Sequence, residues 1–287
     1  MVIAYFMSIL TQLPAFGPTR DRELLKDATT FCYKETDQGA LHAHVFFPLE
    51  HPQDTPTTLL IFFHGGFWDA YAATQFATQC LYFAERGCVC IAAETRVSSR
   101  HQSTPMDAIE DAQDLVIAAK KNCATLGIDP QKVVLAGAAG GALLALHAAM
   151  KKQPRNDESV NSRPQGVVLF SALVDASAGK DHISKFGSRS AAKANSPLKM
   201  TRRKLPPMLF LHGKNDRITP AEPVHSFRRW MRWKGNKVDV IEYDAVDHRF
   251  FNFNCSPTHH DLTMQAMEGF LHKLKLMPQR ENDESHH

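Results

Sequence analysis

The chain has 287 residues, and 33 Lys and Arg against 30 Asp and Glu give a formal net charge of +3 with histidine neutral. Hydrophobic residues make up 44% and charged residues 22%, which is typical of a globular protein and leaves room for one large α/β domain or two small ones. No run of about 18 apolar residues is present, so no transmembrane helix is predicted. The nearly balanced charge argues against a nucleic-acid binder that depends on neutralising phosphates.

The six cysteines are too few for a disulfide scaffold and lack the spacing of a metal site. They indicate free thiols in a reducing compartment, so a cytoplasmic location is expected. Residues 1–17 are apolar but contain no basic residue, which argues against a secretory signal. Within an N-terminal segment 1–29 we instead expect a possible helix that packs over the entrance of a site.

Short apolar or alternating runs alternate with helical stretches along most of the chain. Such runs are typical of strands buried on both faces of a parallel sheet, so the alternation predicts a right-handed, doubly wound α/β fold. The predicted strands are 41–47, 58–66, 88–94, 132–137, 166–173, 207–213 and 238–244. The predicted helices are 73–87, 103–127, 142–152, 224–235 and 262–277.

No internal repeat and no linker divides this pattern, which favours a single domain over residues 30–277. Residues 175–204 form a long irregular stretch between two predicted strands, as expected for a short cap or binding loop. The polar stretch 151–166 is expected to be a surface loop, and 278–287 a polar tail.

Groups that carry chemistry follow three of the predicted strands, at the edge where ligands bind in α/β sheets. The strand at 132–137 leads into a helix through the segment 137–141, Gly-Ala-Ala-Gly-Gly, which has the glycine spacing of a G-x-S-x-G nucleophile elbow. Asp216 and His248 follow two later strands, so the order is elbow, acid, histidine. Earlier in the chain, the segment 64–67, His-Gly-Gly-Phe, is similar to a loop whose N–H groups stabilise an oxyanion.

Together these motifs resemble α/β-hydrolases of the hormone-sensitive-lipase-like or bacterial carboxylesterase and acetylesterase group. The resemblance runs from about residue 30 to 277, and its strength lies in the order of several motifs rather than in any single one. The matching stretches are HGGFW, QFATQCLYFAERG, ETRVSSRHQSTPMDAIEDA, LGIDPQKVVLAGAAGG, LPPMLFLHGKNDRITP and VDHRFFN.

The resemblance implies an α/β-hydrolase fold with a short cap and a role for each matching residue. Position 139 would carry the nucleophile, His248 would be the general base, and Asp216 would orient it. Backbone N–H groups of three glycines would stabilise the oxyanion: Gly65, Gly66 and Gly140. No metal or organic cofactor is implied, and the partner would be a small-molecule ester. The sequence carries no indication of an oligomeric state.

Three aromatic residues adjoin the site loops and are expected to line a substrate pocket: Phe67, Trp68 and Phe250. The alternative for each is ordinary packing in the core, because both ligand pockets and cores are mostly apolar. Phe67 also stands where the family has the third glycine of its oxyanion loop, a difference that is expected to alter the shape of the pocket.

The main departure from the family is the absence of the serine. Members read G-D-S-A-G-G where this chain reads GAAGGA, and alignment through the preceding strand places the nucleophile at Ala139. Alignment on the double glycine would place it at Ala138, with the loss of the first elbow glycine. In either alignment there is no hydroxyl, so the chain as written is expected to lack acyl-enzyme chemistry.

The other groups of the site are all present, which favours a replaced serine over a natural pseudoenzyme. The parent protein is therefore predicted to hydrolyse carboxylic esters of small or medium acyl groups, acetyl esters among them. Two alternatives stay open: an arylformamidase or amide hydrolase, whose HGGYW loop is close to the HGGFW here, and a ligand-binding pseudoenzyme on the same fold.

Overall fold

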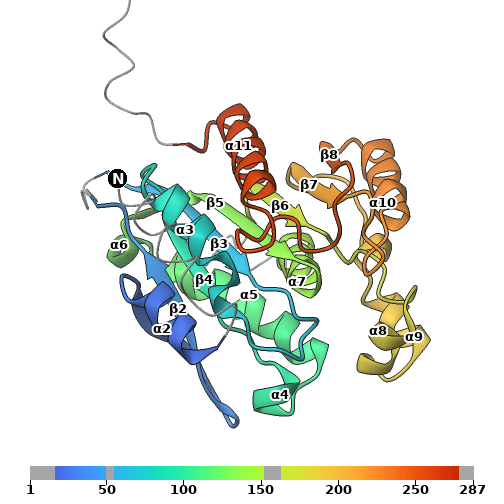
Figure 1. Cartoon of the computed structure of the whole chain (residues 1–287), viewed down its shortest axis with the longest axis horizontal. Coiled ribbons are helices and arrows are strands. Elements are labelled where there is room, and N and C mark those ends of the chain that lie inside the picture. The colour runs from blue at the N-terminus through green and yellow to red at the C-terminus, as the bar shows by residue number, and fades with distance from the viewer. Residues whose placement is uncertain (1–16, 50–54, 152–162, 278–287) are drawn as a thin grey trace, which may run out of the picture.

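The computed structural model describes residues 17–49, 55–151 and 163–277 (Figure 1). Residues 1–16 of the predicted N-terminal segment 1–29, the tail 278–287 and most of the polar loop 151–166 lie outside the described residues. The described chain forms one eight-stranded sheet in the order β1-β2-β4-β3-β5-β6-β7-β8. The strands are β1 (Thr29–Thr36), β2 (Gly39–Phe46), β3 (Thr57–Phe63), β4 (Val89–Ala93), β5 (Ile128–Ala138), β6 (Gly166–Phe170), β7 (Met208–Gly213) and β8 (Val238–Tyr243).

Strand β2 pairs antiparallel with β1 and β4, and every pairing from β4 to β8 is parallel. The predicted α/β fold with a mostly parallel, doubly wound sheet is therefore confirmed. All seven predicted strands are present. Strand β1 was not predicted, because its sequence, TTFCYKET, is polar and none of its residues is fully buried.

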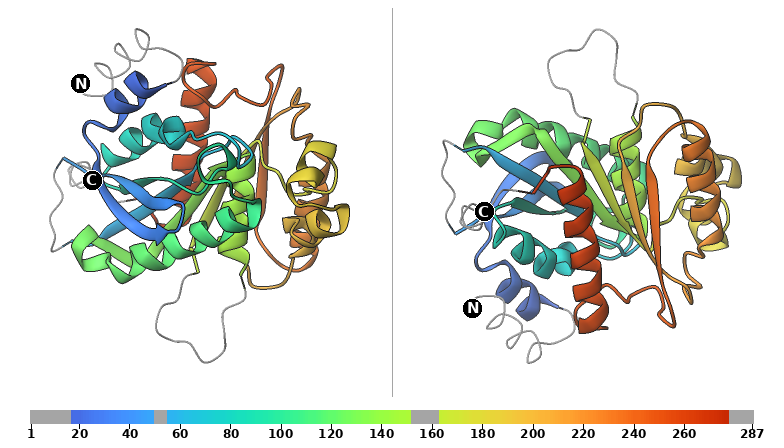
Figure 2. Two further views of the ribbon diagram at one scale, coloured as in Figure 1. Left: turned by 90° about the horizontal axis from the view of Figure 1, so that it is seen from below. Right: turned by 90° about the horizontal axis from the view of Figure 1, so that it is seen from above.

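The sheet is covered on both faces, which explains the unbroken apolar runs of its central strands. In β3, Leu59, Ile61 and Phe63 belong to one core cluster and Leu60 and Phe62 to the other. Helices α5 (Pro105–Lys121), α7 (Gly140–Met150) and α10 (Glu222–Trp233) cover the first face, and α3 (Ala77–Ala84) and α11 (Pro257–Lys273) cover the second (Figure 2). Within the described ranges no helix has both the length and the apolar character to cross a bilayer.

The helices agree with the predicted helical stretches at most positions. The predicted helix 103–127 is divided at Asn122 into two helices, and its first turn has a capping box between Thr104 and Asp107. The helical segments outside the cap are α2 (Pro18–Leu25), η1 (Ala73–Phe76), α3 (Ala77–Ala84), α4 (Ser98–His101), α5 (Pro105–Lys121), α6 (Cys123–Leu126), α7 (Gly140–Met150), α10 (Glu222–Trp233) and α11 (Pro257–Lys273).

The predicted cap segment, 175–204, contains three short helical segments: α8 (Lys180–Lys185), α9 (Arg189–Ala194) and η2 (Pro197–Lys199). Figure 1 shows α8 and α9 together, beyond one end of the sheet. The segment is attached to the domain by hydrogen bonds from Leu198 N to Val174 O, at 3.0 Å, and between His147 Nε2 and Asn195 O, at 2.7 Å.

Candidate active site

The turn between β5 and α7 has the conformation of a strand-to-helix elbow. Ala139 lies between the two elements with φ 51° and ψ −113°, a backbone conformation that costs a non-glycine residue free energy. The turn is tight enough that a Cβ added to Gly137 would lie 2.4 Å from the carbonyl oxygen of Gly141. Ala138 remains in β5, paired with Phe170. Of the two alignments, the structure therefore gives the elbow conformation to position 139.

Two loops at the same edge of the sheet bring Asp216 and His248 together. Asp216 follows β7 and His248 follows β8, and Asp216 Oδ2 lies 2.8 Å from His248 Nδ1. Thr219 also contacts both, because its hydroxyl donates to Asp216 Oδ2 at 2.9 Å and lies 3.0 Å from His248 Nδ1. Sequence reasoning missed Thr219, whose only local indication is its position three residues after Asp216.

The carboxylate of Asp216 is buried and strongly stabilised in its charged form. Burial by itself raises the pKa of Asp216, but the hydrogen bond and charge of His248 and the hydrogen bonds from Thr219 lower it to about 2. Its Oδ1 accepts hydrogen bonds from the backbone N–H groups of Ile218 and Thr219, both at 2.9 Å. Asp216 thus remains ionised at neutral pH and is fixed to hold the His248 ring.

The loop after β3 lies against the elbow, and its glycines differ in their surroundings. A Cβ added to Gly140 would lie 3.0 Å from Cα of Phe67, so this loop and the start of α7 are in close contact. The N–H of Gly65 donates to Gln75 Oε1 at 2.7 Å and is already occupied. Gly66 is exposed, and within the described residues its N–H and that of Phe67 have no such acceptor.

Phe67 connects the loop after β3 to His248 and to the cap. Its ring stacks on His248 at a centroid distance of 5.8 Å and, at 4.7 Å, on His182 of α8. The backbone of Phe67 has φ 51°, a left-handed conformation at the place where the family has glycine. His182 was missed by sequence reasoning because nothing in the local sequence of the cap distinguishes it.

The other two aromatic residues of the expected pocket lie deeper. Trp68 is 3% exposed and packs edge-on against Phe186 of the cap, at a centroid distance of 5.5 Å. Phe250 is 2% exposed and packs against Tyr243 and Phe251 in the core on the α11 side. These contacts of Phe250 are those of ordinary core packing, the alternative that the sequence also left open for this ring.

Comparison with known proteins agrees with this geometry. A family model described as the alpha/beta hydrolase fold matches residues 60–198. The structure of Thermogutta terrifontis esterase 2 phosphoramylated by tabun superposes with a TM-score of 0.82 at 30% sequence identity, over 89% of this chain and 98% of that one. The chain belongs to the α/β-hydrolase family. The resemblance inferred from the motifs is confirmed at this level.

Two curated proteins are similar to this chain at lower sequence identity. A rice protein (Oryza sativa subsp. japonica) described as a probable isoprenylcysteine alpha-carbonyl methylesterase is 27% identical over 192 residues, 58% of this chain and 44% of its own. Esterase LipC of Mycobacterium tuberculosis is 26% identical over 223 residues, 68% of this chain and 53% of its own. The chain thus spans about half the length of these curated relatives.

A cavity of about 200 Å³ in this α/β hydrolase is lined by the segment after β6, by the start of the cap segment and by the loop after β7. Two of its lining residues contact Ala139 or His248 directly, and a third contacts His248 through the ring of Phe67. Leu173 N donates to Ala139 O at 3.3 Å, Thr219 contacts His248, and His182 stacks on Phe67, which stacks on His248. The cavity thus borders residues that contact Ala139 and His248, although neither of these two lines it, and it is called the cavity beside the elbow below.

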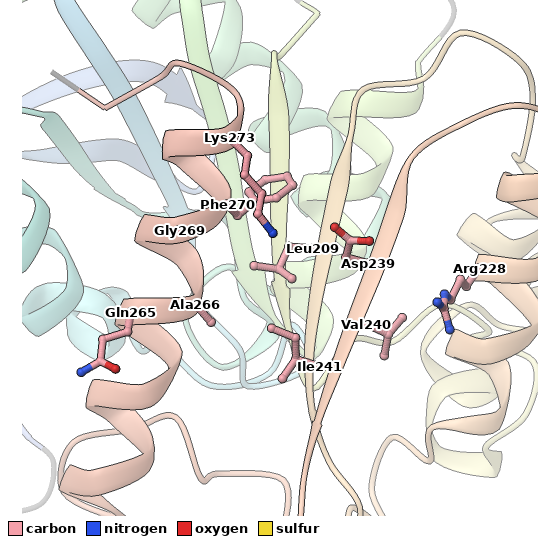
Figure 3. A pocket seen from close by; sticks show the side chains of 10 residues that line it. All are labelled: Leu209, Arg228, Asp239, Val240, Ile241, Gln265, Ala266, Gly269, Phe270 and Lys273. Carbon is pink, nitrogen blue, oxygen red and sulfur yellow. The ribbon is translucent and has the colours of Figure 1, made fainter. Parts of the chain in front are cut away.

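A larger groove of about 450 Å³ lies elsewhere, between α11 and the edge strand β8 (Figure 3). Its floor is mostly apolar, with Leu209, Ile241 and Phe270, and its flanks carry Arg228 and Lys273. None of the predicted site residues lines it, and within the described residues none of its lining residues makes a hydrogen bond or ring contact with Ala139, Asp216 or His248, so we assign it no part in the site.

The remaining histidines of the predicted strands have partners in the structure. The rings of His42 and His44 both contact the carboxylate of Glu94, at 3.2 and 3.1 Å. The two histidines therefore pack around one partly buried carboxylate. Across the described ranges, no cluster of three or more His, Cys, Asp or Glu is arranged to hold a metal ion.

Proposed function

We propose that this site is that of a carboxylic ester hydrolase in which alanine occupies the place of the nucleophilic serine. The observation that carries the proposal is the elbow conformation of Ala139, at the same sheet edge as the hydrogen-bonded pair Asp216–His248. A residue is held in such a costly conformation only where the surrounding structure imposes it, and such positions cluster at active sites. The names of the relatives, which are esterases, support the same chemistry.

With serine at position 139, His248 accepts the hydroxyl proton as the oxygen attacks the ester carbonyl. The resulting tetrahedral oxyanion is stabilised by backbone N–H groups. We assign these to Gly66, Phe67 and Gly140, with Phe67 in place of Gly65, whose N–H is held by Gln75. Collapse releases the alcohol, which takes its proton from His248, and water then hydrolyses the acyl enzyme through the same base.

The chain as written has every group of this scheme except the attacking oxygen. We infer that it binds esters or their acids without forming an acyl enzyme. Structures of the Thermogutta terrifontis esterase are reported with propionate and with butyrate bound. Together with the small cavity beside the elbow, this supports a preference for short acyl groups. We further propose that residues 175–204 act as the cap over this site, since His182 and Phe186 contact the aromatic residues of the loop after β3.

The decisive experiment compares the chain as given with Ala139→Ser and with Ala138→Ser. Each is assayed on p-nitrophenyl esters from acetate to octanoate and is incubated with paraoxon, which phosphorylates the Thermogutta enzyme. We expect hydrolysis and a covalent paraoxon adduct, located by peptide mass spectrometry, with serine at 139 alone, and the highest rate for a short acyl chain.

Absence of both activity and adduct in a folded Ala139→Ser protein would contradict the proposal. Hydrolysis of an aryl formamide but of no ester by that variant would replace it with the amide-hydrolase alternative. Equal hydrolysis by the chain as given would show that the reaction does not use an oxygen at position 139.

A further inference from the structure

The cavity beside the elbow has an uneven distribution of charge. Three titratable side chains line it: Asp175, His182 and Arg217. Asp175 is already satisfied, because its Oδ1 accepts hydrogen bonds from the N–H and the hydroxyl of Ser177 and from the hydroxyl of Ser196. Asp175 therefore takes part in a local hydrogen-bond network with Ser177 and Ser196, and it forms no ion pair with Arg217.

The side chain of Arg217, unlike that of Asp175, makes no polar contact within the part of the chain that the structure describes: its guanidinium takes part in no ion pair or hydrogen bond. A guanidinium always carries its charge and has a planar set of donors that matches a carboxylate. The pKa of His182 is lowered, chiefly by burial, so this ring adds no fixed charge at neutral pH. Arg217 is thus the permanent positive charge on the wall of this cavity.

The position of Arg217 relates this charge to the reacting groups. It directly follows Asp216 in the loop after β7, and Thr219 of the same loop contacts both Asp216 and His248. The lining also includes apolar residues, among them Leu173, whose N–H donates to the carbonyl of Ala139. A ligand that reaches from the elbow into this cavity would therefore meet apolar side chains and the exposed guanidinium of Arg217.

We propose that this cavity binds a carboxylate of the substrate through Arg217, so that the site selects short esters that carry one negative charge. The inference rests on the proposed ester hydrolysis and names its substrate class: monoesters of short dicarboxylic acids, or short acyl esters of hydroxy acids. The volume of about 200 Å³ supports a short substrate, because it is below the roughly 300 Å³ at which ordinary small-molecule pockets begin.

The first experiment needs no turnover and uses the chain as given, with alanine at 139. Dissociation constants are measured by NMR titration for monomethyl succinate, for its uncharged analogue dimethyl succinate, and for O-acetylglycolate. We expect the two charged esters to bind about fivefold to tenfold more tightly than the diester, the range for a charge-assisted contact at a partly exposed site.

Substitution of Arg217 measures how much its charge contributes to the preference for charged esters. Arg217→Ala is expected to weaken binding of the charged esters to the level of dimethyl succinate and to leave the diester unchanged. Arg217→Lys should retain part of the preference. Arg229→Ala is the matched control, because Arg229 is exposed on α10 and lies outside the cavity. Tighter binding of monomethyl succinate would place the carboxylate on the acyl half of the substrate, and tighter binding of O-acetylglycolate would place it on the alcohol half. Either outcome supports the proposal.

Equal binding of charged and uncharged esters, or a preference that survives Arg217→Ala, would overturn the anion site. The same pairs are then compared by kcat/KM in Ala139→Ser. If that variant hydrolyses esters without a charge preference, the anion site fails while the proposed hydrolysis stands. If it hydrolyses nothing although the binding preference is present, the hydrolysis fails and the anion site stands.

Discussion

His248 Nδ1 lies 2.8 Å from Asp216 Oδ2, although 32 residues separate them in the chain. Because the charged form of Asp216 is stabilised in the folded protein, its pKa falls from 3.8 to about 2. A carboxylate whose pKa is lowered by folding stabilises the fold above its unfolded pKa, and this contribution is lost as the pH falls through the folded pKa. The relevant pH window is therefore from about 4 down to about 2.

We expect Asp216→Asn to lower the free energy of unfolding by about 2 kcal/mol at pH 6, and the difference from the parent chain to shrink as the pH falls toward 2. Urea denaturation at a series of pH values measures both. Asp244→Asn is the control, since Asp244 is exposed and pairs with Lys214 at the surface. A difference that is independent of pH would show that the ionised form of Asp216 does not stabilise the fold.

The elbow provides a second prediction, on packing. A Cβ added to Gly141 would lie 2.2 Å from the carbonyl oxygen of Phe63, a backbone atom at the end of the central strand β3. We expect Gly141→Ala to lower the free energy of unfolding by about 3 kcal/mol or more, since the backbone must move.

Gly269→Ala is the matched change in a different helix. A Cβ at position 269, in α11, would meet no atom within 4 Å, so alanine should stabilise the protein by about 0.5–1 kcal/mol through its higher helix propensity. Denaturation of both variants tests the pair, and similar effects at the two positions would contradict the close approach at Gly141.

A buried ion pair supports the segment that follows β4. Asp111 is fully buried in α5 and accepts hydrogen bonds from the backbone and the guanidinium of Arg96 and from Lys34 Nζ at 2.9 Å. Replacement of Asp111 by Asn removes the fully buried counter-charge of these cations, whose other acidic partners in the described ranges are partly or fully exposed, so we expect a loss of about 3–5 kcal/mol. Asp114→Asn, which removes a partly exposed partner of the same lysine, should cost below about 1 kcal/mol. Thermal or urea unfolding that ranks the two variants in the reverse order would exclude this account.

Gln75 is a positioning residue for the loop after β3, because it holds the N–H of Gly65 and its own amide donates to Asn252 Oδ1 at 3.1 Å. In the Ala139→Ser background, we expect Gln75→Ala to lower kcat about tenfold with a smaller change in KM, since the loop would no longer hold its donors in place. Gln265→Ala, at the distant groove, should leave both constants unchanged. A rise in KM alone would assign Gln75 to substrate binding instead.

Much of the fold was predictable because its evidence is local. The run TLLIFF indicates a strand that is buried on both faces, and β3 lies at the centre of the sheet with its residues divided between the two cores. The glycines around Ala139 likewise indicate the tight turn, since few other residues fit such close backbone contacts. By contrast, β1 and the helices of the cap carry no comparable pattern, and sequence reasoning did not find them.

The sequence by itself determined the order of the elements, the place of the elbow, and the chain order of Asp216 and His248. Only the tertiary structure decided which groups touch: Gln75 holds Gly65, Phe67 stacks between His182 and His248, and Phe250 is enclosed in the core. The physical reason is that periodicity and turn chemistry act over a few residues, whereas these contacts join segments far apart in the chain. Such contacts depend on how the loops pack at the edge of the sheet, which no local pattern records.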